Sequence, residues 1–162
     1  MRPLVAMGLL ACAAAAAAHP ARHGNPSILE SAARLTPGQY VWEPGASPGG
    51  SILVVIDLSA QRAMLYGNGV LIAASTVSTG RKGRRTPTGG FTILEKKIVH
   101  RSRTYDDAPM PYMQRLTWKG VAMHAGHVSG RPASHGCIRL PWGFARRLYA
   151  VTTIGTPVAI RA

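Results

Sequence analysis

Short apolar segments alternate with turns rich in glycine, proline and asparagine along this sequence. Residues 52–57 form an apolar, β-branched run that is typical of a buried strand. Residues 62–66 and 70–77 flank Gly67-Asn68-Gly69, which predicts a hairpin because Asn and Gly tolerate positive φ. Further strands are expected over residues 91–94, 120–124 and 156–160, and a helix over 142–149. Closely spaced strands with one or two short helices predict a mainly β, β-sandwich-like fold.

The length of 162 residues fits one domain with appendages. We expect this domain over residues 51–162. Residues 20–50 hold five prolines and five glycines, which predicts a linker with one short helix near 28–35. Residues 1–19 combine Arg2, a short apolar run and an alanine tract. This pattern predicts a signal peptide and export to the periplasm or cell envelope.

The chain has two cysteines, Cys12 and Cys137. Residues 9–12 resemble a lipoprotein processing box, which would leave Cys12 as a lipid anchor, whereas cleavage near the end of the alanine tract would remove it. In both cases the mature domain keeps one cysteine. An unpaired thiol in an oxidising compartment indicates a chemical role for Cys137.

Three of the six histidines lie within the short stretch that ends at Cys137. A nucleophilic cysteine needs a neighbouring base, because a free thiol with a pKa of about 8.5 is mostly protonated at neutral pH. His135 is two residues from Cys137, roughly 6.5–7 Å along an extended strand, which is too far for a hydrogen bond. His124 ends a separate predicted strand, and adjacent strands lie only about 4.8 Å apart. We therefore expect His124 to be the base, His135 to line the pocket, and backbone N–H groups around Gly136 and Cys137 to bind an oxyanion.

The order His124-x-Gly, then Ser134-His135-Gly136-Cys137 and Arg139, resembles the signature of the L,D-transpeptidase catalytic domain. The similarity includes Thr86-Pro87-Thr88-Gly89 and covers about residues 51–161. The resemblance implies a β-sandwich and an acyl-enzyme formed on Cys137 by a peptidoglycan tetrapeptide stem. D-Ala would leave, and an amine would accept the acyl group.

The same resemblance implies roles for single residues. His124 would be the general base, oriented by the backbone carbonyl of Ala125. Ser134, His135 and Arg139 would contact substrate, although position 139 carries Asn in other members of the family. The spacing between His124 and Ser134 is short, which predicts a small flap over the cleft.

Several other interpretations compete with this one. Zinc binding by His124, His127, His135 and Cys137 is an alternative, but this spacing is not that of a usual zinc finger, and we expect no metal and no cofactor. Two further alternatives are transfer of the acyl group to water, as in a carboxypeptidase, and binding of the cell wall without catalysis.

The formal net charge of +13 indicates polyanionic partners. The export signal and an aromatic content of only 6% disfavour nucleic acid. The basic run from Arg81 to Arg85 is expected to be a solvated loop, with docking on anionic envelope polymers as its second interpretation. We expect a monomer.

Overall fold

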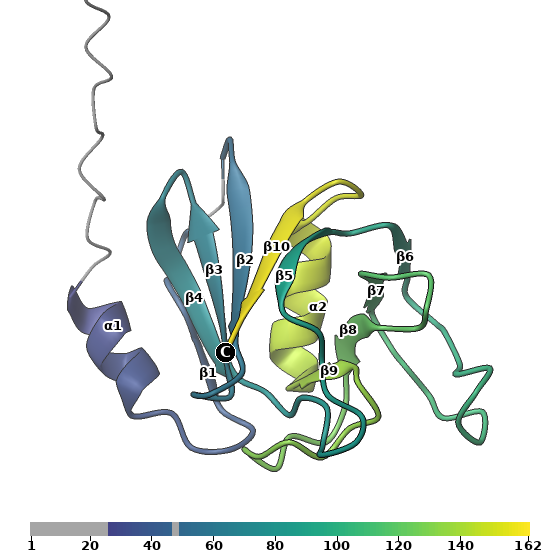
Figure 1. The fold of residues 1–162 in the computed structure, drawn as a ribbon. Helices are drawn as coiled ribbons and strands as arrows, with labels where there is room; N and C mark the ends of the chain where they lie inside the picture. Colours follow the sequence, from purple (N-terminus) through teal and green to yellow (C-terminus); the bar gives the residue numbers. More distant parts are fainter. Residues whose placement is uncertain (1–25, 47–48) are drawn as a thin grey trace, which may run out of the picture.

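The computed structural model describes residues 26–46 and 49–162. They form two β-sheets with one helix between them and a second helix at the N-terminal end (Figure 1). The elements are α1 (Pro26–Ala33), β1 (Tyr40–Trp42), β2 (Ile52–Asp57), β3 (Arg62–Gly67), β4 (Val70–Thr76), β5 (Gly89–Thr92), β6 (Glu95–Lys97), β7 (Met113–Arg115), β8 (Ala122–Ala125), β9 (Ile138–Leu140), α2 (Trp142–Val151) and β10 (Pro157–Arg161). The predicted mainly β fold is confirmed.

The larger sheet has the order β1-β4-β3-β2-β10-β5. Its centre is the predicted hairpin, in which β3 pairs antiparallel with both β2 and β4. Asn68 and Gly69 make the turn with φ of 50° and 77°, a conformation that these two residue types adopt at low cost. The C-terminal β10 returns parallel to β2, so the two ends of the predicted domain meet at the middle of the sheet.

The smaller sheet has the order β6-β7-β8-β9. Its last pair, β8 and β9, is parallel, with Met123 opposite Ile138 and His124 opposite Arg139. An isolated antiparallel bridge between Ser78 and Arg139 connects this sheet to the end of β4. The smaller sheet is therefore held at the end of the larger one, where the chain leaves β4.

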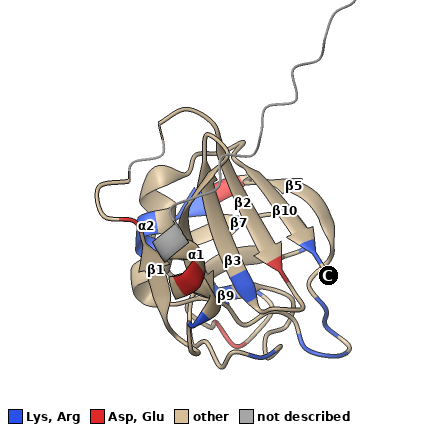
Figure 2. Ribbon diagram, turned by 90° about the vertical axis from the view of Figure 1, so that its left-hand side faces the viewer, with Lys and Arg blue, Asp and Glu red and all other residues tan. Residues whose placement is uncertain are grey.

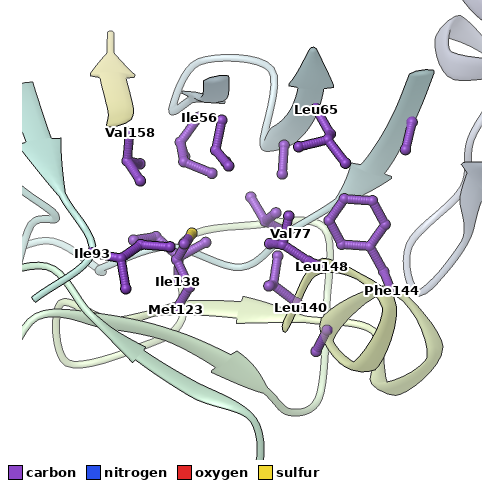
Figure 3. Packing of buried hydrophobic residues seen from close by; sticks show 14 of the residues in the cluster. Ile56, Leu65, Val77, Ile93, Met123, Ile138, Leu140, Phe144, Leu148 and Val158 are labelled. Atoms are coloured by element: carbon purple, nitrogen blue, oxygen red, sulfur yellow. The ribbon is translucent and has the colours of Figure 1, made fainter. Parts of the chain in front are cut away.

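The hydrophobic core lies between the two sheets and α2 (Figure 3). Ile56 and Leu65 of the larger sheet face Leu140 of the smaller sheet and Phe144 of α2, and all four side chains are fully buried. Burying side chains of this size stabilises the fold by about 1.5–3 kcal/mol each. The predicted helix after Pro141 thus supplies the side chains that close the core.

The segment predicted as a linker belongs largely to the fold. The expected short helix is present as α1, but β1 then pairs antiparallel with β4, with Tyr40 opposite Ser75. The Tyr40 ring packs 5.9 Å from the ring of Phe144 and lies so close to Gly143 that a β-carbon there would be 2.5 Å from the tyrosine hydroxyl. The sheet therefore begins before Ser51, because aromatic side chains of the segment complete the core.

The three-residue strands β6, β7 and β9 were not expected from the sequence. Each is too short to show an alternating pattern, and their pairing comes from the neighbours that tertiary structure provides. The predicted signal peptide, residues 1–19, lies outside the described residues. Within the part of the chain that the structure describes, no helix has the length and apolar character needed to cross a membrane.

Candidate active site

A cleft of about 710 Å³ opens on the face of the smaller sheet, and both Cys137 and His124 line it. His124 lies in β8, and Cys137 immediately precedes β9. Because β8 and β9 are parallel neighbours with His124 opposite Arg139, the side chains of His124, Arg139 and Cys137 project from the same face. His124 and Cys137 therefore lie across neighbouring strands, as the sequence predicts.

The orientation of the His124 ring is set by its own strand. Its Nδ1 lies 2.8 Å from the backbone oxygen of Ala125, and a carbonyl oxygen can only accept a hydrogen bond. The proton therefore lies on Nδ1, and Nε2 keeps a free lone pair. Burial lowers the pKa of His124, the hydrogen bond to Ala125 opposes this, and the charge of Arg139 lowers the pKa further. The imidazole is neutral at pH 7.

The Cys137 thiol points towards the turn before β8. Its Sγ donates a hydrogen bond of 3.4 Å to the backbone oxygen of Gly120. Burial raises the pKa of this thiol, while the backbone N–H of Ala122 and the charges of Arg139 and Arg115 act in the opposite direction. No hydrogen bond joins Cys137 to His124 among the described residues. The resting site therefore holds a neutral thiol beside a neutral imidazole.

Ser134 organises the loop that carries Cys137. Its Oγ donates a 2.5 Å hydrogen bond to the backbone oxygen of Cys137 and accepts one of 3.1 Å from the N–H of Gly136. Gly136 has a φ of 122°, which only glycine adopts without strain. The expectation that the Gly136 N–H binds an oxyanion requires correction, because Ser134 already occupies it. Ser134 is almost fully buried at the edge of the cleft, and its two hydrogen bonds shape the loop.

Thr86 supports this loop from a distant part of the chain. Its Oγ1 accepts a hydrogen bond from the N–H of Gly80 and donates one of 2.9 Å to the oxygen of Gly136. Thr79, the residue before Gly80, is held by the buried side chain of Gln61. Gln61 Nε2 donates a 2.7 Å hydrogen bond to Thr79 Oγ1, and Gln61 Oε1 accepts one of 3.0 Å from the Thr79 N–H. Sequence reasoning noted the Thr-Pro-Thr-Gly motif but assigned no role to Thr86 or Gln61. A buried hydroxyl in a loop gives no periodic signal.

Residues 98–112 form an excursion that lines one side of the cleft, and Gly126 and His127, between His124 and Ser134, line it as well. Hydrogen bonds from Met110 N–H to His100 and from Tyr112 N–H to Ile98 close this excursion at its base. At its tip the Tyr105 ring stacks on His135 with 4.3 Å between ring centroids. Arg84 donates a 3.1 Å hydrogen bond to the Tyr105 hydroxyl. Nothing in the local sequence of this region indicates a contact with His135.

The remaining predicted residues occupy different places. Arg139 lines the cleft, and its side chain packs over Gly126, where a β-carbon would be 3.4 Å from Arg139 Cγ. His127 is an exposed residue at the rim. The four residues considered for zinc are not gathered into a metal site, since the described part of the chain has no group of three or more potential ligands in suitable positions.

The structure thus defines a two-sheet β domain whose cleft presents a cysteine and a buried histidine on adjacent parallel strands. Residues 51–160 match the L,D-transpeptidase catalytic domain family. The chain therefore belongs to this family.

Solved structures of L,D-transpeptidases have the same fold. One from Mycobacterium smegmatis is 27% identical, with a TM-score of 0.64 over 70% of this chain and 60% of that chain. One from Mycobacterium tuberculosis is 25% identical, with a TM-score of 0.64, and the match covers 70% of this chain and 59% of that chain. An L,D-transpeptidase in complex with imipenem is 27% identical, with a TM-score of 0.62, and the match covers 70% of this chain and 60% of that chain. The chain thus spans about 60% of the length of these structures, and no curated protein matches it.

Proposed function

We propose that this chain is a peptidoglycan L,D-transpeptidase that forms an acyl-enzyme on Cys137. The substrate would be a tetrapeptide stem, and terminal D-Ala would be released before an amine accepts the acyl group. The observation that carries the proposal is the position of the His124 lone pair. Because Nδ1 donates to Ala125, Nε2 is free to take a proton in the cleft that also holds the Cys137 thiol.

Acylation begins when Nε2 of His124 removes the proton from Sγ, and the thiolate attacks the carbonyl carbon of the third stem residue. The oxyanion forms near the backbone N–H of Cys137, which has no hydrogen-bond acceptor among the described residues. When the tetrahedral intermediate collapses, the C–N bond breaks. The imidazolium gives its proton to the leaving nitrogen of D-Ala.

The second half of the reaction reverses these roles. An acceptor amine attacks the thioester carbonyl while His124 takes a proton from the attacking nitrogen. The C–S bond then breaks, and the sulfur recovers a proton from the imidazolium. Residues 98–112 line one side of the cleft, and we expect them to limit access of water to the thioester, which would favour transfer over hydrolysis.

The proposed location is the cell envelope, where this substrate is found. It rests on the signal peptide predicted for residues 1–19, with lipidation of Cys12 or cleavage near the alanine tract as the two forms of processing. Anionic envelope polymers are proposed as additional partners because the chain carries a net charge of +13.

The test uses a purified muropeptide with a tetrapeptide stem, with and without an excess of acceptor amine, and product masses as the readout. We expect loss of D-Ala and a new amide with the acceptor. Cys137→Ala should give no product while keeping its fold. A carbapenem should add one adduct mass on Cys137 of the wild type and none on Cys137→Ala. Formation of only the shortened tripeptide under both conditions would identify a carboxypeptidase instead.

A further inference from the structure

The peptide bond between Gly136 and Cys137 carries the N–H group that lies near the proposed oxyanion. A trans peptide is planar, so its carbonyl oxygen and its N–H point to opposite sides. The N–H of Cys137 has no hydrogen-bond acceptor among the described residues, whereas the oxygen of Gly136 accepts a 2.9 Å hydrogen bond from Thr86 Oγ1. The group that holds the Gly136 oxygen therefore also sets the direction of the Cys137 N–H.

Thr86 comes from the loop between β4 and β5, and its hydroxyl is itself fixed. The side chain is buried, and its single hydroxyl proton is donated to Gly136. The same oxygen accepts a 2.9 Å hydrogen bond from the N–H of Gly80. Pro87 restricts the backbone of Thr86 to extended conformations. The hydroxyl is therefore held from both sides against the Gly136 oxygen.

Two glycines allow the loop of Thr86 to come this close to the cysteine. At Gly80, a β-carbon would collide with the backbone oxygen of Arg84 and would lie 2.6 Å from the backbone nitrogen of Thr86, so only glycine fits. At Gly136, φ is 122°, and a β-carbon would be 3.8 Å from the same Arg84 oxygen. The loop is therefore wound tightly enough to place a hydroxyl against the peptide that precedes Cys137.

The peptide that follows Cys137 is fixed in a similar way. Ser134 Oγ donates its 2.5 Å hydrogen bond to the oxygen of Cys137. Hydroxyl groups of Thr86 and Ser134 thus hold the carbonyl oxygens immediately before and after the thiol-bearing α-carbon. Because Cys137 lines the cleft, its thiol and its N–H are the groups that remain available to a substrate there.

We infer that Thr86 is a positioning residue for the oxyanion. By holding the Gly136 oxygen, it aims the N–H of Cys137 at the oxygen that becomes negatively charged when the thiolate attacks a carbonyl carbon. Thr86 does not line the cleft, so it acts only through this peptide. A peptide without this hydrogen bond rotates about its flanking bonds, and a misdirected donor stabilises the oxyanion less because hydrogen bonds weaken steeply with angle. The inference rests on the proposed function, since an oxyanion forms only if Cys137 is acylated.

The experiment compares two reactions of the same thiol in wild type and in Thr86→Val, which removes the hydroxyl at nearly unchanged volume. Acylation by a carbapenem passes through an oxyanion, whereas alkylation by iodoacetamide displaces iodide from a saturated carbon and forms none. In Thr86→Val, the limiting acylation rate should fall by about 10–100-fold, which is less than the loss expected when an oxyanion donor is removed outright. The carbapenem concentration at half-maximal rate should change little. The rate of alkylation and its pH dependence should be unchanged.

Two further variants separate positioning from general destabilisation. Thr86→Ser keeps the hydroxyl and should restore most of the acylation rate. Thr76→Val is the matched control, because Thr76 is also buried and its Oγ1 also joins a glycine N–H, that of Gly38, to a backbone oxygen, that of Gln39. Thr76 lies outside the cleft, so this substitution should leave both reactions unaffected. Urea denaturation should show a similar loss of stability in the two valine variants.

The outcomes distinguish the inference from the proposed function on which it rests. Acylation of Thr86→Val at the wild-type rate overturns the inference and leaves the proposed function intact. Loss of acylation and alkylation by the same factor also overturns it, because the thiol itself has then been displaced. Thr86→Ala provides the same comparison should the valine variant fold poorly. A wild-type protein that is alkylated, but acylated by neither the carbapenem nor the muropeptide stem, overturns the proposed function together with the inference.

Discussion

The thiol of Cys137 and the imidazole of His124 are each neutral in this structure, for the same physical reason. Burial disfavours the charged form of both groups, which raises the pKa of Cys137 and lowers that of His124. The thiol donates to Gly120 rather than to the imidazole. In the proposed acylation, the thiol proton therefore has to rotate from Gly120 towards Nε2 of His124.

The role of His124 is tested against a neighbouring histidine. His124→Ala should lower kcat for acyl transfer by about 10²–10⁴-fold, because it removes the positioned base. His127→Ala should lower kcat by less than about tenfold, since His127 is exposed at the rim. Steady-state kinetics with the muropeptide and amine give both values. If His127→Ala has the larger effect, the assignment of the base is wrong.

The pKa shifts determine how activity depends on pH. His124 accepts a proton only when neutral, and its lowered pKa keeps it neutral down to values below about 6.5. The acid limb of kcat/KM should therefore lie below pH 6.5. Alkylation of free Cys137 by iodoacetamide should rise with an inflection above about 8.5, because burial raises the thiol pKa. An acid limb at pH 7 or above, or an alkylation inflection below pH 8, would contradict this description.

At this scale the sequence predicted which residues meet in the cleft better than which residues position them. That Cys137 and His124 share one cleft could be predicted from their residue types and from the expectation of adjacent strands. The positions of Thr86 and Tyr105 depend on loops that meet only in the folded chain, so no local pattern reveals them. The prediction that the Gly136 N–H binds an oxyanion failed for a similar reason. The hydrogen bond from this N–H to Ser134 depends on the loop geometry, which no local pattern reveals.

At the scale of secondary-structure elements, β1 shows that part of the segment predicted as a linker is a strand of the larger sheet. Five prolines and five glycines indicated a linker, and this composition outweighed the signal from Tyr40 and Trp42. Both rings pack against Phe144, at 5.9 and 5.8 Å between centroids. The long strands were predictable because β-branched runs and the Asn-Gly turn are local signals. The pairing of β1 with β4 joins segments more than 30 residues apart, which no local pattern specifies.

We expect Tyr40→Ala to lower the free energy of unfolding by about 2–3 kcal/mol, through lost apolar burial and lost ring contact with Phe144. Urea denaturation followed by circular dichroism measures this value. Trp118→Ala is the matched control, because this ring is 74% exposed and should change the free energy by less than about 0.5 kcal/mol. Equal effects of the two substitutions would show that β1 is not part of the stabilising core.

At the scale of the whole molecule, the positive charge lies in two regions, the cleft and an exposed loop. The cleft holds cations that surround the reacting groups, whereas the run from Arg81 to Arg85 is an exposed loop outside it. Figure 2 shows basic stretches in the loops at the lower end of the molecule, beyond the strands of the larger sheet. The residues proposed to bind substrate and those proposed to attract a polyanion therefore differ, although Arg84 of the loop donates a hydrogen bond to Tyr105 of the cleft.

Binding to an anionic envelope polymer should follow from this loop and from the net charge of +13. Lys82 and Arg85 are exposed, and among the described residues their side chains form no hydrogen bond or ion pair, unlike Arg84, which donates a hydrogen bond to Tyr105. The double substitution Lys82→Gln and Arg85→Gln should weaken sedimentation with lipoteichoic acid or with lipopolysaccharide vesicles, and it should make binding less sensitive to salt. Turnover of a small soluble muropeptide should remain unchanged, because that substrate reaches the cleft without a polymer. Unaltered sedimentation of the double variant, with turnover intact, would show that the loop is only a solvated surface.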